Sequence, residues 1–141
     1  MAIGSALDSD NRTLRGGSCD GDWMTEYQEQ QTVFEYAHGY AGNLDSRLRM
    51  LHAVENAKGN GRPPAGAEES AGVPDMFLAV SVPPFHGLYI ELKTQTGKVS
   101  AKQKRWQKAL RLQGYASEIC YGADGAIETL RQYLDGRLPP F

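Results

Sequence analysis

The sequence predicts a mixed α/β domain in which helices pack on a central β-sheet. Three observations support this fold class. An amphipathic stretch over residues 25–40 begins at a capping box, and two short apolar stretches, 75–80 and 88–93, have the length of strands. A helix–strand–helix pattern then fills residues 100–134. The 141 residues are enough for one such domain with a single hydrophobic core.

The first predicted helix begins at the Thr25–Gln28 capping box and continues to about Tyr40. Apolar residues at helical spacing would form its buried stripe, namely Val33, Phe34 and Ala37. Gln30 and Glu26 lie one and two turns before that stripe, on much the same face. Two polar groups that lead into an apolar face are candidates for a functional site.

The residues around this helix are less regular. Residues 1–22 are polar and rich in glycine, serine and aspartate, so we expect a flexible arm followed by a single domain over 23–141. Residues 45–56 fit both a helix and a strand, and we favour a short helix that runs into a strand. Residues 57–72 contain many glycines and prolines and are predicted to form a surface loop.

The second half of the chain has clearer periodicity. In the strand over 88–93, Leu88, Ile90 and Leu92 alternate with Tyr89, Glu91 and Lys93, so the two sets face opposite sides of the sheet. A capping box of Ser100 and Gln103 opens a helix that ends at Gly114. A strand over 115–120 and a helix over 124–134 complete the predicted fold.

Cysteine usage and hydropathy indicate the setting of the protein. Cys19 and Cys120 are too few for a disulfide framework or a cysteine-based zinc site, so we expect two free thiols in a reducing compartment. No apolar run approaches the roughly 20 residues that span a bilayer, and the N-terminus lacks the features of a signal peptide. We therefore expect a cytoplasmic protein that has no membrane partner.

The charge distribution is more informative than the net charge of −2. Residues 1–90 hold twelve acidic and six basic side chains, whereas residues 91–141 hold five acidic and nine basic ones. The segment 92–117 contains seven basic residues and no acidic residue. Such a run is often a solvated helix face, but it can also contact phosphates.

Asp75, Glu91 and Lys93 form the constellation that suggests chemistry. If the two middle strands pair, Asp75 at the start of one converges on Glu91 of the other. Two converging carboxylates are costly unless a positive group lies between them, and a hard divalent cation such as Mg²⁺ is the usual solution. Lys93 adds a second positive group nearby. The alternative is an exposed Glu91–Lys93 ion pair beside a turn that uses Asp75.

These residues resemble the PD-(D/E)xK nuclease superfamily, whose motif matches Pro74-Asp75 followed by Glu91-Leu92-Lys93. More closely, residues 24–134 look like the stand-alone virus-type replication-repair nuclease (VRR-NUC) domain of phages and prophages. The remaining matches are Glu26 with Gln30, residues 72–75, residues 87–93, residues 100–103 with Trp106, and Gly114-Tyr115. The resemblance implies a PD-(D/E)xK nuclease core with a central mixed sheet flanked by helices.

The resemblance also implies roles for individual residues. Asp75, Glu91, the carbonyl of Leu92 and Glu26 would bind Mg²⁺ or Mn²⁺, Lys93 would be catalytic, and Gln103 would line the site. Alternatives remain open at two positions: Glu29 competes with Glu26 as the helix carboxylate, and Gln103 could serve only the capping box. His52 is expected to be structural or to face DNA.

In a nuclease, the basic segment would contact the DNA backbone. Such phosphate contacts position DNA without reading its sequence. The residues expected to make them are Lys98, Lys102, Lys104, Arg105 and Lys108. The resemblance implies a Mg²⁺- or Mn²⁺-dependent phosphodiesterase. We expect an endonuclease that selects branched DNA, because small stand-alone members of the family look like Holliday-junction resolvases. An enzyme that resolves a junction makes two nicks and needs two active sites, so we expect a symmetric homodimer. We also expect the protein to act in the cytoplasm of a bacterial host, encoded by a phage or prophage. The alternatives are a non-catalytic DNA-binding module with the same fold and a phosphate-metabolising enzyme unrelated to DNA.

Overall fold

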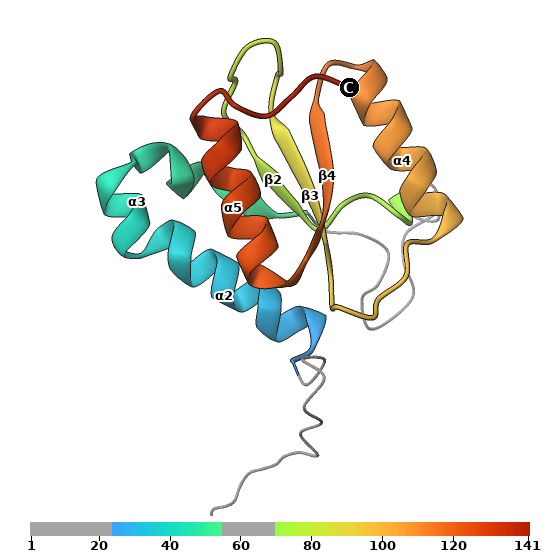
Figure 1. The fold of residues 1–141 in the computed structure, drawn as a ribbon, viewed down its shortest axis with the longest axis horizontal. Helices are drawn as coiled ribbons and strands as arrows, with labels where there is room; N and C mark the ends of the chain where they lie inside the picture. The colour runs from blue at the N-terminus through green and yellow to red at the C-terminus, as the bar shows by residue number, and fades with distance from the viewer. Residues whose placement is uncertain (1–23, 55–69) are drawn as a thin grey trace, which may run out of the picture.

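The computed structural model describes residues 24–54 and 70–141, which fold into a four-stranded sheet flanked by helices (Figure 1). The elements follow the order α2 (Glu26–His38), α3 (Tyr40–Leu44), a 3₁₀ turn η1 (Ser46–Met50), β1 (Leu51–Ala53), β2 (Met76–Leu78), β3 (Leu88–Lys93), α4 (Ala101–Leu112), β4 (Ala116–Tyr121) and α5 (Gly122–Leu134). The predicted arm over 1–22 and most of the predicted loop over 57–72 lie outside the described residues.

The sheet is mixed, as the sequence predicts. Its strand order is β1-β2-β3-β4, with β1–β2 and β2–β3 antiparallel and β3–β4 parallel. The parallel pair needs a crossover connection, and α4 supplies it. This arrangement makes β3 a central strand, with β2 on one side and β4 on the other.

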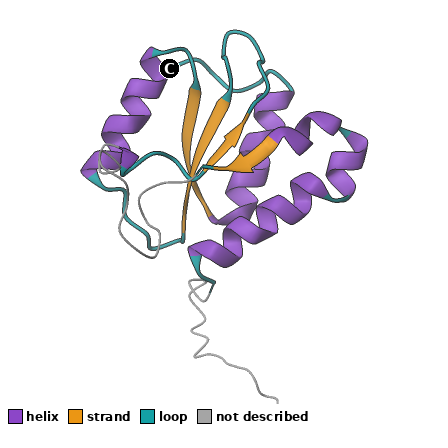
Figure 2. Cartoon of the chain, turned by 180° about the vertical axis from the view of Figure 1, so that it is seen from behind, coloured by secondary structure: helices purple, strands orange, loops and turns teal. Residues whose placement is uncertain are grey.

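The two faces of the sheet have different surroundings. Figure 1 shows α5 and α2 on one side of the strands and α4 on the other, and the rear view in Figure 2 again shows α4 to one side of the strands. The side chains of the strands that face α2 and α5 form the hydrophobic core, including Met76, Leu78, Leu88, Ile90 and Leu92. Val33 and Ala37 of α2 and Leu130 of α5 join them, with no exposed surface. The predicted stripe of α2 is therefore confirmed at two of its three positions.

The structure corrects several predicted boundaries. The first helix ends at His38 rather than Tyr40, because Gly39 leaves helical geometry and α3 begins after it. The strand predicted over 75–80 is shorter, spanning only Met76–Leu78. Gly122 adopts a positive φ of 78°, which lets α5 begin there, two residues before the predicted start. The short helix running into a strand over 45–56 is confirmed as η1 and β1.

Cys120 is a core residue. Its side chain is buried, and burial raises the pKa of the thiol to about 11. The thiol therefore stays protonated at neutral pH and donates to the Thr129 hydroxyl at 3.3 Å. Cys120 is a free thiol as expected, and Cys19 lies outside the described residues. No helix among the described residues is long and apolar enough to cross a membrane.

Replacing Leu130 tests the packing of α5 on the sheet. Leu130→Ala removes a fully buried side chain and should lower the free energy of unfolding by about 2–5 kcal/mol. Leu112→Ala is the matched control because Leu112 is 74% exposed, and it should change stability by less than about 0.5 kcal/mol. Urea unfolding followed by circular dichroism measures both. Equal losses in the two variants would contradict this packing.

Candidate active site

The pairing of β2 with β3 brings Asp75 to Glu91. Met76 pairs with Ile90 in an antiparallel register, so Asp75, one residue earlier, comes opposite Glu91. The Asp75 carboxylate accepts the backbone N–H of Leu92 at 3.0 Å, while its backbone carbonyl accepts the N–H of Val54 at 2.8 Å. These two hydrogen bonds hold Asp75 immediately before β2, against the strand that carries Glu91. The structure therefore places the two carboxylates on adjacent strands, as expected.

Gln103 approaches Glu91 from α4. Its side-chain amide donates to Glu91 Oε2 at 2.9 Å, and both residues are buried. The same side chain accepts the backbone N–H of Ser100 at 2.9 Å, while the Ser100 hydroxyl accepts the N–H of Gln103. The capping box and the contact with Glu91 therefore coexist, because the amide oxygen serves one and the amide nitrogen serves the other.

Lys93 lies between two carboxylates. Its Nζ is 3.7 Å from Glu91 Oε2 and 3.9 Å from Glu26 Oε2 at the start of α2. Glu91 is 3% exposed and Lys93 is 7% exposed, so the alternative of a solvent-exposed ion pair is wrong. Gly97 helps to bury the lysine, since a Cβ there would come within 3.3 Å of the Lys93 stem. A buried ion pair gains little stability over apolar residues of the same size, so its presence favours a chemical role.

The two competing carboxylates of α2 have different neighbours. Glu26 points toward Lys93, as described above. Glu29 Oε2 instead accepts the backbone N–H of Ala123, and it lies against Gly122 at the start of α5. Because the N-terminus of a helix carries unpaired N–H groups and partial positive charge, this contact caps α5. Glu29 thus has a structural partner, and Glu26 is the helix carboxylate that lies beside Lys93.

We call the set Asp75, Glu91, Lys93, Glu26 and Gln103 the carboxylate cluster. Its donor atoms suit a hard cation. They are carboxylate oxygens of Asp75 and Glu91, with the Glu26 carboxylate beside Lys93 as a further oxygen donor. The Leu92 carbonyl, which the resemblance adds, belongs to the same strand as Glu91. Within residues 24–54 and 70–141, no three His, Cys, Asp or Glu side chains gather closely enough to form a metal-binding group by themselves. Mg²⁺ commonly binds through only one or two carboxylates and keeps several waters. The chemistry of the donor set therefore fits Mg²⁺ better than a soft metal.

The basic segment divides into two groups in the structure. The five residues expected to meet phosphates are all exposed: Lys98, Lys102, Lys104, Arg105 and Lys108. The other two bases have intramolecular partners, since Lys93 is buried in the cluster and Arg111 donates to the carbonyl of Ser117 at 2.8 Å. Lys102 and Lys104 flank Gln103 in the sequence, so positive charge lies on both sides of the residue that reaches Glu91.

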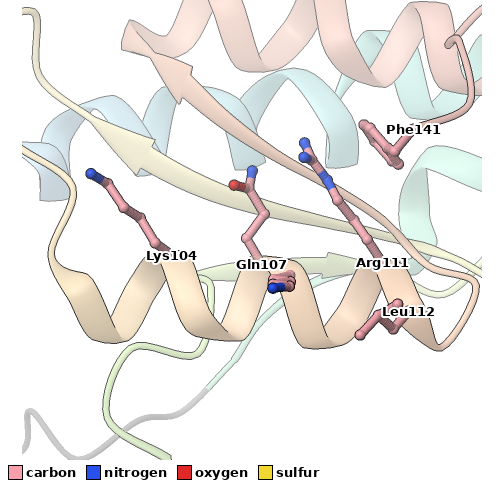
Figure 3. A pocket seen from close by; sticks show the side chains of 6 residues that line it. Lys104, Gln107, Arg111, Leu112 and Phe141 are labelled. Atoms are coloured by element: carbon pink, nitrogen blue, oxygen red, sulfur yellow. The ribbon is translucent and has the colours of Figure 1, made fainter.

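A surface hollow of about 280 Å³ lies along α4. Figure 3 shows Lys104, Gln107 and Arg111 projecting from one side of the helix, with Phe141 near Arg111. The Arg111 guanidinium lies 3.7 Å from the centre of the Phe141 ring, which is a cation–π contact. The hollow is lined by Lys104, Gln107, Lys108, Arg111, Leu112 and Phe141. None of these residues belongs to the carboxylate cluster, so the hollow is a basic surface feature separate from it.

A row of aromatic rings, which the sequence patterns did not predict, lies beside Glu91. Phe77 of β2 stacks on Tyr89 of β3, with ring centres 4.3 Å apart and an angle of 28° between the rings. His52 of β1 contacts Phe77 edge-on, with the two ring centres 5.6 Å apart. Burial, together with the neighbouring Tyr115, raises the pKa of Tyr89, so its hydroxyl stays protonated at neutral pH. The alternation along β3 places Tyr89 on the same face as Glu91. The other rings join Tyr89 only through the register of the neighbouring strands.

Comparisons with known proteins agree with this geometry. The model of the VRR-NUC domain family matches residues 64–124, a segment that includes Asp75, Glu91, Lys93 and Gln103 but not Glu26. A solved structure described as a VRR_NUC domain protein has 24% sequence identity and a TM-score of 0.65, over 80% of this chain and 90% of that chain. This likeness shows a shared fold, and no curated protein gave a significant match. The resemblance to the VRR-NUC domain is confirmed over residues 64–124, the segment that carries the buried Glu91–Lys93 pair, while the phage or prophage type stays a prediction. The match indicates a nuclease-type function in DNA processing.

Proposed function

We propose that this chain is a Mg²⁺- or Mn²⁺-dependent deoxyribonuclease that cuts branched DNA. The observation that carries the proposal is the buried Glu91–Lys93 pair, joined by Asp75 on one side and Gln103 on the other. This cluster lies within the segment that matches the nuclease family. Two carboxylates and an ammonium group at one end of a sheet are the residue types that phosphodiester hydrolysis uses.

Each residue of the cluster has a proposed task. A bound divalent cation would polarise a phosphoryl oxygen and acidify a water molecule. Asp75 and Glu91 would hold it, with the Leu92 carbonyl and Glu26 as further ligands. Lys93 would orient the attacking water and offset the negative charge that develops at phosphorus. The water oxygen forms the new bond to phosphorus, and the bond to one bridging oxygen breaks, which leaves a phosphate end and a hydroxyl end.

Gln103 is a positioning residue in this proposal. Its amide nitrogen donates to Glu91 Oε2, and its amide oxygen is fixed by the Ser100 N–H at the start of α4. A hydrogen bond to a carboxylate fixes the direction of the remaining lone pairs, in the way that outer partners orient metal ligands. The first turn of α4 thereby sets the orientation of the carboxylate, and its exposed lysines bring phosphate close to it.

The exposed bases on α4 bear on the choice of substrate and on the oligomeric state. Exposed bases on α4 suit a phosphate backbone, and such contacts carry no sequence information. Because these contacts do not read sequence, the proposed enzyme is an endonuclease that recognises the structure of its substrate, such as a Holliday junction. Cutting a junction in two places requires two active sites, which a symmetric dimer supplies. The competing function, a non-catalytic DNA-binding module, leaves the buried Glu91–Lys93 pair without a purpose.

Cleavage of labelled DNA tests the catalytic residues. We expect pure protein with Mg²⁺ or Mn²⁺ to cut a labelled four-way junction faster than a linear duplex of the same length, and EDTA to stop the reaction. Asp75→Asn and Lys93→Ala should each lower the rate by about 100-fold or more. Glu128→Gln is the control, because Glu128 is an exposed acid on α5.

The outcomes of this assay separate the two functions. An absence of metal-dependent cleavage on four-way, flap and linear substrates, combined with intact DNA binding, would favour the non-catalytic module. Cleavage that survives Asp75→Asn or Lys93→Ala would contradict the assigned site. Equal rates on junction and duplex would remove the selectivity for branched DNA.

The two carboxylates of α2 provide a matched pair of variants. Glu29→Ala should lower the free energy of unfolding by about 0.5–2 kcal/mol, the usual cost of removing a helix cap, and leave cleavage nearly unchanged at a temperature where the protein is folded. Glu26→Ala should do the reverse, with slower cleavage and little change in stability, because its carboxylate is 41% exposed. The opposite assignment holds if Glu29→Ala is the variant that loses activity.

The salt dependence of DNA binding tests the basic surface. Lys104→Ala and Lys108→Ala should weaken binding similarly for all sequences, and each should reduce the slope of log K against log salt concentration by about 1. Arg131→Ala, an exposed base on α5, is the control. Fluorescence anisotropy in EDTA at several salt concentrations measures the slopes. Unchanged slopes in both α4 variants would show that DNA follows another path.

A further inference from the structure

Five aromatic rings form a connected surface on one face of the sheet, which we call the ring platform: His52, Phe77, His86, Tyr89 and Tyr115. Their ring centres are 5.6 Å apart for His52–Phe77, 4.3 Å for Phe77–Tyr89, 5.5 Å for Tyr89–Tyr115 and 5.8 Å for His86–Tyr115. His52 and His86 are exposed, and Phe77, Tyr89 and Tyr115 are partly buried. The platform is therefore a continuous aromatic layer that solvent reaches.

The ring platform is not part of the hydrophobic core. The same strands send Met76, Leu88 and Ile90 to the opposite face, where α2 and α5 bury them completely. In the rear view of Figure 2 no described helix lies across the strands, and α4 borders the sheet on one side. Gly87 lets the Phe77 ring lie close to the backbone, since a Cβ at that position would be 2.7 Å from the ring.

The ring platform continues directly into the carboxylate cluster. Tyr89 and Glu91 project from the same face of β3, two residues apart, which is about 6.6 Å along a strand. Stacked nucleotides rise about 3.4 Å each, so this separation corresponds to one or two nucleotides. A phosphate beside Glu91 would therefore place a neighbouring base over Tyr89 and Phe77.

The charges around the platform favour a nucleic acid as its occupant. Lys102 is exposed and precedes Gln103, which contacts Glu91, so the phosphate backbone and the bases would meet complementary surfaces side by side. Bases that are not paired stack readily on tyrosine, phenylalanine and histidine rings. Paired bases have no free face to offer, so the platform selects nucleotides that have left the duplex.

We propose that the ring platform stacks an unpaired base next to the phosphate that is cut, so that the substrate is DNA with unpaired nucleotides at the cleavage point. This inference rests on the proposed nuclease function and gives it a physical basis for selecting branched DNA, because branch points expose unstacked bases. Tyr89 and Phe77 are the central rings. Lys102, in the first turn of α4 beside Gln103, binds the backbone of the same strand.

A binding experiment on two nearly identical DNA molecules tests the ring platform. The first is a fluorescein-labelled duplex with one unpaired adenine nucleotide, and the second carries an abasic nucleotide at that position. Fluorescence anisotropy is measured in EDTA, where cleavage does not interfere. We expect the wild-type protein to bind the adenine-containing DNA about 5- to 150-fold more tightly, the range that one base–aromatic stack gives.

Ring-removing variants locate the stacking surface. Tyr89→Leu and Phe77→Leu should reduce the preference for adenine to less than about 2-fold, whereas Tyr89→Phe should keep it because the ring remains. Tyr40→Leu is the matched control, since Tyr40 is 77% exposed on α3 and lies outside the platform. Thermal unfolding of each variant shows that it is folded. The wild-type comparison of the two DNA molecules stands even if Phe77→Leu does not fold.

The outcomes distinguish this inference from the nuclease function. Equal affinity of the wild-type protein for both DNA molecules would overturn the platform, whether or not the protein cuts DNA. Preference for adenine without metal-dependent cleavage of any substrate would support the platform and contradict the nuclease. A Tyr89→Leu variant that changes from dimer to monomer in sedimentation, with its preference for adenine intact, would instead show that the rings join two copies of the chain.

Discussion

The buried pair of Glu91 and Lys93 is the constraint on which the rest of this structure depends. Two charged side chains lie at the end of a central strand, 3% and 7% exposed, where charges are costly unless they are paired and hydrogen-bonded. Each partner comes from a different element. Gln103 of α4 donates to Glu91, and Glu26 of α2 lies beside Lys93. Asp75, immediately before β2, accepts the Leu92 N–H. The start of α4, the start of α2 and the β2–β3 register therefore all meet at one point.

The strand β3 serves two surfaces because successive side chains alternate. Leu88, Ile90 and Leu92 complete the core against α2 and α5, while Tyr89, Glu91 and Lys93 face the other side. The core residues give the strand its stability, so the opposite face can carry charges and exposed rings. Acidic and basic residues are also unevenly distributed along the chain, since no acidic residue occurs between 92 and 117. A negatively charged polymer would meet the exposed lysines of α4 before it reaches the carboxylates.

Local patterns predicted much of the fold. The capping boxes at Thr25 and Ser100 give the starts of α2 and α4, and alternation over 88–93 gives the faces of β3. Asp75 and Glu91 could be placed together because neighbouring strands separated by a short turn usually pair. The motif itself could not decide between a buried and an exposed pair, because burial depends on how α4 and the turn at Gly97 pack on β3.

Contacts between distant segments could not be predicted in this way. Glu29 caps α5 through Ala123, which is 94 residues later in the chain, so no local spacing reveals it. The ring platform likewise requires the register of three strands, and the row from His52 to Tyr89 exists only when they pair as observed. Arg111 looked like one more surface base, but it binds the Ser117 carbonyl and the Phe141 ring. Sequence patterns identify candidate residues, and packing determines which of them remain available to a ligand.

The most direct test of the central claim is the binding of Mn²⁺ to the protein without DNA, measured by electron paramagnetic resonance. If Asp75 and Glu91 hold the divalent cation, the wild-type protein binds Mn²⁺ at a site from which Mg²⁺ displaces it. Asp75→Asn then abolishes this site, while Glu29→Ala retains it. A protein that binds no Mn²⁺, or a site that survives Asp75→Asn unchanged, would contradict the account.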